Sequence, residues 1–361
     1  MSLPSDVVSR LRLIRTDSIG PVTYRQLVAR FGDAATALKA LPDLARRGNR
    51  TLALYPEAQA QAELETAAKI GAHLLFIGTP DYPFLLARTE TAPPVLYARG
   101  DLSLLDRPAV AIVGARNASA AGIRFARQLA MDLAEADQVI VSGLARGIDA
   151  AAHAAALERG TIAVVAGGAD VPYPPDHADL MARIADKGLV IAEQPPGIHP
   201  QARHFPRRNR IIAGLSAGTI VVEGAPKSGS LITARIAADL GREVMAVPGS
   251  PLDSRAQGCN LLIREGATLI QNAADVLEAL STLAGQPALR FDAAEPLPTP
   301  ALSPEPQARA AILTLLSPTP VHIDELIRLS ALPAAQVAGV LLDLELEGVV
   351  LRHAGARAAL A

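Results

Sequence analysis

The run AVAIVG at residues 109–114 is the first of six similar apolar segments in the middle of this 361-residue sequence. These segments show no alternation of polar side chains, as expected of strands buried on both faces. Stretches with helical periodicity lie between them, and this alternation predicts a parallel sheet covered on both sides. Right-handed crossovers then favour a Rossmann-like, doubly wound α/β fold. The other five runs are QVIVSG (138–143), TIAVVAGG (161–168), LVIAEQ (189–194), TIVVEG (219–224) and EVMAVPG (243–249).

The sequence divides into four parts by composition and hydrophobic pattern. Residues 1–70 carry helical patterns only and predict an all-α module. Residues 71–285 form the predicted Rossmann-like domain, to which HLLFIG (73–78) and VLYARG (95–100) add edge strands. Residues 286–306 include EPLPTPALSPEP and form a Pro-rich linker by composition. Residues 307–361 return to helix and fit a winged-helix domain.

The composition narrows the class of protein. Half of the residues are hydrophobic and 19% are charged, as in soluble globular proteins. No apolar stretch has the length of a membrane span, and the N-terminus lacks the apolar region of a signal peptide. The single cysteine, Cys259, suits a reducing compartment, so we expect a cytoplasmic protein without membrane association. Because the net charge is −2 and aromatic residues make up 3%, a nucleic-acid site would need local clustering of cations and would have few stacking side chains.

Glycine and hydroxyl side chains gather at the carboxyl ends of the predicted strands. In a doubly wound sheet these ends share one edge, where the helix N-termini also point. Glycine lets backbone N–H groups approach an anion closely, and Ser or Thr adds donors, so the turns predict a long phosphate-binding groove. The alternative is that these residues serve only as tight turns and N-caps. The turns are GARNAS (114–119), SGLARGID (142–149), AGGADVPYP (166–174), EGAPKSGS (223–230) and PGSP (248–251).

Cations fall on the same turns. Arg116 lies in the first, Arg146 in the second, and Lys227 precedes a Ser-Gly-Ser run in the fourth. The sequence between Glu193 and Glu223 has no carboxylate but several arginines, some at the start of an apolar helix, where a cation is unfavourable unless an anion is nearby. Arginine forks match phosphate oxygens, so these side chains are expected to converge on the groove. The arginines of this stretch are Arg203, Arg207, Arg208 and Arg210.

Nucleotide motifs and catalytic sets are absent from the sequence. The first turn lacks G-x-G-x-x-G and no P-loop pattern occurs, so NAD binding and ATP hydrolysis are disfavoured. The histidines and the one cysteine show no metal-ligand spacing, and we expect no cofactor. Asp149 and His153, four residues apart, could orient one another, and Glu193 and Glu223 end two strands near the groove. We interpret all four as structural and Cys259 as a buried apolar residue, and we expect no enzyme.

The central sequence resembles the DNA-processing protein A (DprA/Smf) family from about Pro108 to Ala267. The strings that carry the resemblance include VAIVGARNAS (110–119), VIVSGLARGIDAAAHAAAL (139–157), TIAVVAGGADVPYPPDH (161–177) and HFPRRNRIIAGLS (204–216). The resemblance implies a single-stranded DNA-binding protein of natural transformation that protects incoming strands and helps load a RecA-type recombinase, usually as a homodimer. GAR (114–116) and NASAAG (117–122) stand where the family more often has GSR and S-x-Y-G, which puts one packing or base contact in doubt.

The same resemblance implies a set of DNA-binding positions, and they coincide with the groove argued from glycines and cations. They are Gly114, Arg116, Ser142, Gly143, Arg146, Arg207, Arg208, Asn209, Arg210, Lys227, Ser228, Gly229 and Ser230.

The flanking parts show weaker resemblances. DSIGPVTYRQLVARFG (17–32) looks like a helix-hairpin-helix or sterile-α-motif-like module, whose Ile-Gly-Pro turn could touch a DNA backbone. In the winged-helix part, the third helix would be the one to enter a DNA groove, yet it has no Lys or Arg and carries Asp343, Glu345 and Glu347. Because phosphate binding needs cations, we hypothesise that this domain binds a protein.

Two other functions remain open from the sequence. Rossmann-like phosphoribohydrolases act on nucleotides at a related edge, but they carry P-G-G-x-G-T-x-x-E, whereas this sequence has VPGSP (247–251) and no glutamate at that spacing. The other is a structural interaction protein whose turns bind nothing. The DNA-binding function is the one we expect.

Overall fold

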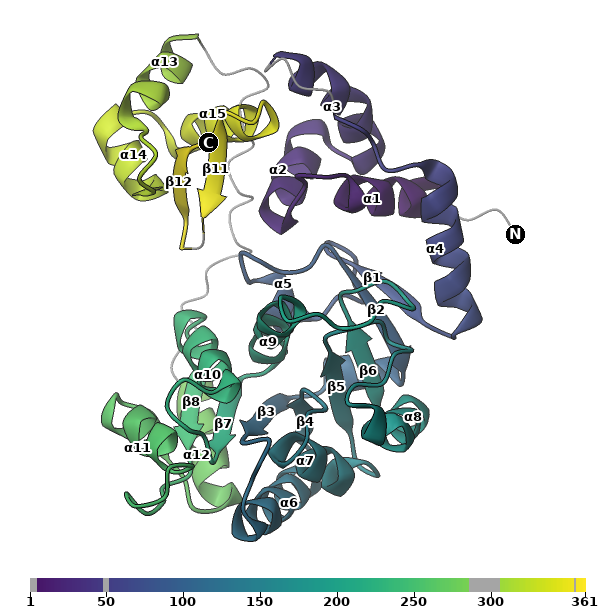
Figure 1. The fold of residues 1–361 in the computed structure, drawn as a ribbon, viewed down its shortest axis with the longest axis vertical. Helices are drawn as coiled ribbons and strands as arrows, with labels where there is room; N and C mark the ends of the chain where they lie inside the picture. Colours follow the sequence, from purple (N-terminus) through teal and green to yellow (C-terminus); the bar gives the residue numbers. More distant parts are fainter. Residues whose placement is uncertain (1–4, 48–51, 286–305, 354) are drawn as a thin grey trace. The chain divides into compact units, whose positions relative to one another are not determined.

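The structure, a computed structural model, describes residues 5–47, 52–285, 306–353 and 355–361 (Figure 1). It divides into a central unit, Glu63–Ala288, and a terminal unit that combines Met1–Ala62 with Leu289–Ala361. The predicted linker lies outside the described residues except for Pro306. Since the structure groups the chain into two units, the four-part division remains a prediction.

The central unit is built on one nine-stranded sheet with the order β1-β2-β6-β5-β4-β3-β7-β8-β9. The pairs β1–β2 and β2–β6 are antiparallel, and all the others are parallel. The six predicted runs are β3 to β8. HLLFIG supplies the edge strand β1, but VLYARG supplies β2, which pairs on both sides and is not an edge strand. The strands are β1 His73–Phe76, β2 Val95–Gly100, β3 Ala109–Gly114, β4 Val139–Ser142, β5 Thr161–Val165, β6 Leu189–Ala192, β7 Gly218–Val222, β8 Glu243–Ala246 and β9 Thr268–Leu269.

Helices cover both faces of this sheet, as the uninterrupted apolar runs predict. Successive residues of β3 point to opposite faces: Ala109, Ala111 and Val113 join one core, and Val110 and Ile112 join the other. The first core includes residues of α5, α9, α10 and α11, and the opposite face is covered by α6, α7, α8 and α12. The predicted doubly wound α/β class is confirmed. These helices are α5 Phe84–Ala87, α6 Ala120–Glu135, α7 Ile148–Ala156, α8 Ala178–Lys187, α9 His204–Leu215, α10 Gly229–Asp239, α11 Gln257–Arg264 and α12 Ala273–Gly285, with the 3-10 turns η1 Leu102–Asp106 and η2 Pro175–His177.

The terminal unit combines the helical N-terminal module with the winged helix. The winged helix has a small sheet in the order β10-β12-β11, and a core in which Ile312, Leu326, Val340 and Val350 meet. The predicted wing, VVLRH (349–353), contains β11. The elements are α1 Ser5–Arg15, α2 Pro21–Phe31, α3 Ala34–Arg47, α4 Glu57–Lys69 (which continues into the central unit), α13 Pro306–Leu315, β10 Val321–His322, α14 Ile323–Ser330, α15 Ala334–Leu346, β11 Val350–His353 and β12 Arg357–Leu360.

Within the described residues, no single helix is both long and apolar enough to cross a bilayer. The helices α14 and α15 reach that length and composition only together, and a bend of 118° separates them.

Candidate nucleic-acid interface

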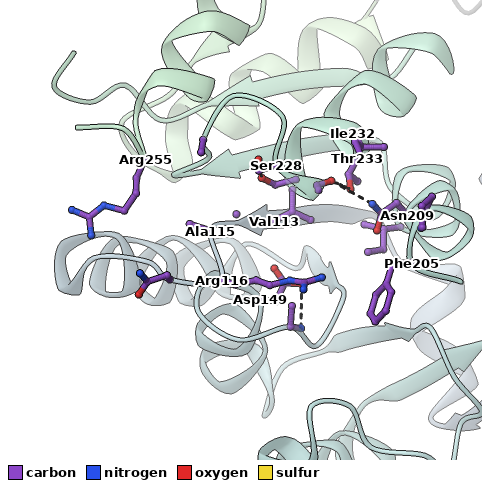
Figure 2. A pocket seen from close by; sticks show the side chains of 18 of the residues that line it. Val113, Ala115, Arg116, Asp149, Phe205, Asn209, Ser228, Ile232, Thr233 and Arg255 are labelled. Carbon is purple, nitrogen blue, oxygen red and sulfur yellow. Dashed lines mark hydrogen bonds between the residues drawn. The ribbon is translucent and has the colours of Figure 1, made fainter. Parts of the chain in front are cut away.

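The order in which strands are added to the sheet reverses at β3, which pairs with β4 on one side and with β7 on the other. The chain runs outward from β3 through β4, β5 and β6, and then returns to β7, so the loops that follow β3 and β7 diverge. In open α/β sheets this switch point is where a crevice forms at the carboxyl ends of the strands. A cavity of about 730 Å³ opens here, lined by the β3–α6 loop, the start of α9, the start of α10 and the loop around Arg255 (Figure 2).

Arg208 is the buried cation of this cavity. It lies in the first turns of α9 with only 7% of its surface exposed, and burial lowers the pKa of its guanidinium. Its Nη1 atom makes one long hydrogen bond, 3.4 Å, to the carbonyl oxygen of Val164, and Nε has no partner among the described atoms. A Cβ atom on Gly143 would lie 1.3 Å from Nη1, so only glycine leaves room for the guanidinium.

Asp149 fixes the loop opposite Arg208. Its carboxylate accepts hydrogen bonds from the backbone N–H groups of Gly143 (3.1 Å) and Ala145 (3.3 Å). Between them, Leu144 has a left-handed φ of 55°, a conformation that costs energy for a side chain with a Cβ and needs such support. Burial raises the pKa of Asp149, and the charge of Arg208 opposes that shift. We infer that Asp149 holds the loop and partly balances the buried guanidinium.

His153 does not pair with Asp149 as the sequence suggested it could. Its Nδ1 atom lies 2.7 Å from the hydroxyl of Thr161, which in turn donates to the carbonyl of Ile140. Burial lowers the pKa of His153 to about 3, so the imidazole is neutral at physiological pH. Its role is structural.

Two exposed arginines flank the cavity. Figure 2 shows Arg116 extending from the end of β3 toward Phe205, and its guanidinium lies 5.5 Å from the centre of that ring. Arg146 pairs with Asp176 at 2.5 Å, with both side chains more than half exposed. Such exposed pairs contribute little, so a phosphate can replace the carboxylate at small cost. Arg116, Arg146 and Arg208 together line a second, smaller cavity of about 90 Å³ next to the first.

The start of α10 supplies neutral donors on the other wall. Ser228 precedes the helix without capping it, although its hydroxyl lies 2.9 Å from that of Ser230. The Asn209 amide donates to the carbonyl of Gly229 at 3.3 Å and so ties α9 to α10. An uncapped helix N-terminus with nearby hydroxyl groups is favourable for an anion.

The structure brings together nine of the thirteen predicted positions along these two cavities. The other four lie outside their linings. Ser142 is buried and donates to the carbonyl of Ile112 at 2.6 Å, and Arg210 pairs with Glu193. Arg207 and Lys227 are exposed to solvent. The nine are Gly114, Arg116, Gly143, Arg146, Arg208, Asn209, Ser228, Gly229 and Ser230.

Two aromatic side chains at the site were not predicted. Tyr173 is 45% exposed, and its ring centre lies 5.4 Å from that of Phe205 at an interplanar angle of 56°. Both line the cavity that contains the three arginines. The low aromatic content of the sequence concealed them, although Phe205 stands only two residues before Arg207. Tyr173 is exposed and Phe205 is half-buried, and aromatic rings beside cations can stack against nucleic-acid bases.

The strand-end carboxylates and the cysteine are occupied by structural contacts. Glu223 accepts hydrogen bonds from both the backbone N–H (2.8 Å) and the side-chain hydroxyl of Ser119, the residue before α6. Glu193 forms an ion pair with Arg210. Cys259 is buried, and burial raises the pKa of its thiol to about 11, which disfavours the reactive thiolate. Among the described residues, no group of three His, Cys, Asp or Glu side chains could hold a metal ion.

Comparison with known proteins gives consistent matches over most of the chain. Residues 73–281 match the family model of DNA recombination-mediator protein A, residues 4–66 a DprA-like N-terminal HHH domain, and residues 295–356 a DprA winged-helix domain. Protein Smf from Synechocystis sp. is 38% identical over 309 residues, covering 77% of each chain. DNA processing protein DprA from Streptococcus pneumoniae is 48% identical over 198 residues, covering 54% of this chain and 70% of that protein.

Two solved structures share both fold and sequence. The X-ray structure of DprA from Streptococcus pneumoniae has a TM-score of 0.64 and 34% identity, covering 77% of this chain and 98% of that one. DprA from Helicobacter pylori, whose structure concerns its single-stranded DNA binding mode, has a TM-score of 0.53 and 31% identity, covering 59% of this chain and 96% of that one. The protein described here therefore belongs to the DprA/Smf family of DNA-processing proteins.

Proposed function

We propose that this protein binds single-stranded DNA along the carboxyl edge of its central sheet. The observation that carries the proposal is the convergence of Arg116, Arg146 and Arg208 on adjoining cavities at the switch point. Bare N–H groups and hydroxyls at the start of α10 line the same opening, so a polyanion meets donors from several elements. Single-stranded DNA binding by the Helicobacter pylori relative supports this assignment.

The arginines hold the strand by its phosphates, while Tyr173 and Phe205 offer ring faces to the bases. Phosphate contacts and stacking are both tolerant of sequence, so the preference for particular bases is weak. The thirteen positions inferred from the sequence are the proposed site, with Tyr173 and Phe205 added. Of those outside the cavity linings, the exposed Arg207 and Lys227 are proposed to contact the backbone where the strand leaves the groove, and the buried Ser142 to support the loop from below.

Family membership supports the biological role that we propose. The protein protects incoming single strands and helps load a RecA-type recombinase during transformation, as a cytoplasmic homodimer. It acts as a binding and loading protein and not as an enzyme. The structural use of Glu193 and Glu223 is consistent with that role, because neither carboxylate is free for hydrolysis.

A salt-titrated comparison of single- and double-stranded DNA binding tests the proposal. If about four phosphates are neutralised, the log–log salt slope for single strands is about −3, since each contributes ~0.7. Charge reversal at the exposed Arg116, or Arg208→Met at the buried position, removes most of the affinity while the circular dichroism spectrum is retained. Unchanged binding in both variants would refute the site.

The phosphoribohydrolase alternative is not favoured. Incubation with a nucleoside monophosphate and a search for free base distinguishes it, because only a hydrolase releases the base. We expect no release above that of a buffer control.

A further inference from the structure

A further cavity, of about 290 Å³, opens at the amino edge of the central sheet, and we call it the amino-edge cavity. The residues where β3 and β5 begin, Ala109 and Ile162, belong to its lining. The strand β3 then runs to Gly114 in the DNA groove, and its two ends are roughly 17 Å apart at ~3.3 Å per residue. A molecule bound in the amino-edge cavity therefore leaves the groove open.

The lining of the amino-edge cavity is largely apolar. On α5, Leu86 is fully buried and lies against Gly214 of α9, whereas Phe84, two residues earlier, lines the cavity and is 65% exposed. The turn η1 contributes Leu104, which is buried, and Leu105, which is half-buried. An aromatic ring in water beside an apolar hollow is the arrangement that an apolar side chain of a partner fills.

Three arginines surround this apolar surface. The guanidinium of Arg88 lies 4.2 Å from the centre of the Phe84 ring. Arg107 lines the cavity and donates from Nη1 to a backbone carbonyl at 2.8 Å. Arg242 donates from Nη2 to the carbonyl of Leu85 at 3.1 Å, and its buried Nε has no partner among the described atoms. Within the described part of the chain, none of the three forms an ion pair with a carboxylate.

The charges of these arginines are not balanced locally. Burial lowers the pKa of Arg242, and the charge of Arg88 lowers it further, so the two cations repel one another. Asp106 is the one carboxylate among the residues that line the cavity, and it is exposed. A backbone carbonyl satisfies an N–H group but carries no net charge. Anionic groups of a ligand therefore gain from charge complementarity at this surface.

The shape and chemistry of the cavity favour a protein side chain over a nucleotide. Its volume lies at the lower end of the ~300–1,000 Å³ range of small-molecule pockets, which suits one bulky side chain. Its lining is dominated by Leu, Ile, Ala and Pro side chains, and the polar edge of a nucleic-acid base would lose its hydrogen bonds to water against them. An aliphatic or aromatic side chain loses none.

We propose that the amino-edge cavity, with Phe84 and the three surrounding arginines, docks an acidic segment of a partner protein in which carboxylates flank one bulky apolar side chain. The apolar side chain fills the cavity beside Phe84, and the carboxylates pair with Arg88, Arg107 and Arg242. This interaction goes beyond the proposed DNA binding, because it uses the opposite edge of the sheet and both sites can be occupied together.

Selection from a phage-displayed library of random peptides of about 12 residues tests the proposal on the full chain. The DNA groove is first filled with excess oligothymidine, so that its arginines do not retain acidic peptides. A parallel selection uses the Phe84→Ala, Arg88→Gln double variant, in which both altered side chains are exposed. Peptides enriched on the wild-type chain alone are expected to carry Asp or Glu next to Phe, Leu or Ile. No such enrichment, or enrichment of basic or uncharged peptides, contradicts the proposal.

The most enriched peptide is then synthesised with a fluorescent label, and its affinity is measured by anisotropy. Phe84→Ala and Arg88→Gln are each expected to weaken binding roughly tenfold, and added salt is expected to weaken it further. Met131→Ala and Arg124→Gln are the matched controls, since they alter an exposed apolar and an exposed basic side chain of α6 on the other face of the sheet. Equal affinities of Phe84→Ala and the wild type would overturn the assignment.

Single-stranded DNA binding by the double variant separates a protein ligand from a nucleic acid. Its DNA affinity is expected to equal that of the wild type, because the groove is unaltered. A loss of DNA affinity would assign the surface to nucleic acid and refute protein docking. A chain that binds the peptide but no DNA would refute the proposed groove and leave the docking site standing.

Discussion

Arg208 in the central unit and Arg30 in the terminal unit are both almost fully buried, but their surroundings differ. Arg30 meets Asp343 directly at 2.5 Å. Arg208 makes one long hydrogen bond to a carbonyl oxygen and lines a cavity of about 730 Å³. The carboxylate of Asp149 accepts hydrogen bonds from the backbone N–H groups of a loop and not from Arg208. A buried cation with a dedicated carboxylate is a structural contact, whereas one without such a partner beside a cavity is prepared for an anionic ligand.

The largest expected effect comes from exchanging these two arginines for methionine. Arg30→Met leaves Asp343 buried and uncompensated, which costs about 3–5 kcal/mol in the stability of the terminal unit. Arg208→Met removes a charged hydrogen bond to phosphate, expected to weaken single-stranded DNA binding by roughly 10- to 100-fold. Thermal unfolding and anisotropy on both variants measure the two effects.

The contrast between the two arginines is wrong if Arg208→Met lowers stability and Arg30→Met lowers single-stranded DNA affinity. Arg208→Met has to keep the circular dichroism of the central unit, and folded Arg30→Met has to keep the single-stranded DNA affinity. A large loss of stability with intact DNA affinity in Arg208→Met would make Arg208 a structural residue like Arg30.

The aromatic pair distinguishes stacking from charge in the same groove. Phe205→Ala is expected to weaken single-stranded DNA binding by about 1–3 kcal/mol, the contribution of one stacked base. Because no cation is removed, the salt slope stays that of the wild type. Tyr173→Phe keeps the ring and serves as the control, with affinity close to wild type. A changed slope in Phe205→Ala would mean that the ring acts by orienting Arg116 and not by stacking.

A smaller effect is expected from the glycine beneath Arg208. In Gly143→Ala the new methyl group would lie 1.3 Å from Nη1 of Arg208, so the guanidinium has to move. A shift of the cation while its charge remains is expected to weaken DNA binding by about 1 kcal/mol, less than its removal. Gly20→Ala, in the terminal unit and outside the groove, is the control, because nothing lies within 4 Å of its added Cβ. Equal affinities of the two variants would show that Arg208 does not depend on Gly143.

The sequence predicted the fold of the central unit and the edge that carries the site, because buried strands and glycine turns are local patterns. It did not predict which of the neighbouring arginines enters the cavity, which faces solvent and which pairs with a carboxylate. Successive residues of a helix point about 100° apart, so Arg207 faces solvent, Arg208 enters the cavity and Arg210 meets Glu193. Only the packing of α9 on the sheet decides which of them lines the cavity.

The contact within the terminal unit could not be predicted either. Arg30 and Asp343 are 313 residues apart, and no local pattern joins them. The third helix of the winged helix is acidic, which is unusual for a DNA-reading helix, and the hypothesis that it binds a separate protein stays a prediction. In the structure, the N-terminal module of the same chain covers it.

The smallest expected effect concerns Glu345, the less well compensated carboxylate of that contact. Burial raises its pKa above the ordinary value of 4.5, against the opposing effect of Arg352. The folded protein therefore holds this proton more tightly than the unfolded chain, so the contribution of Glu345 to stability is full below pH 4.5 and is lost as pH rises through the raised pKa. In Glu345→Gln that decline is absent. Urea unfolding of the terminal unit between pH 5 and 8 is expected to show a flatter pH dependence in the variant than in the wild type, and parallel curves would mean that Glu345 is as well paired as Asp343.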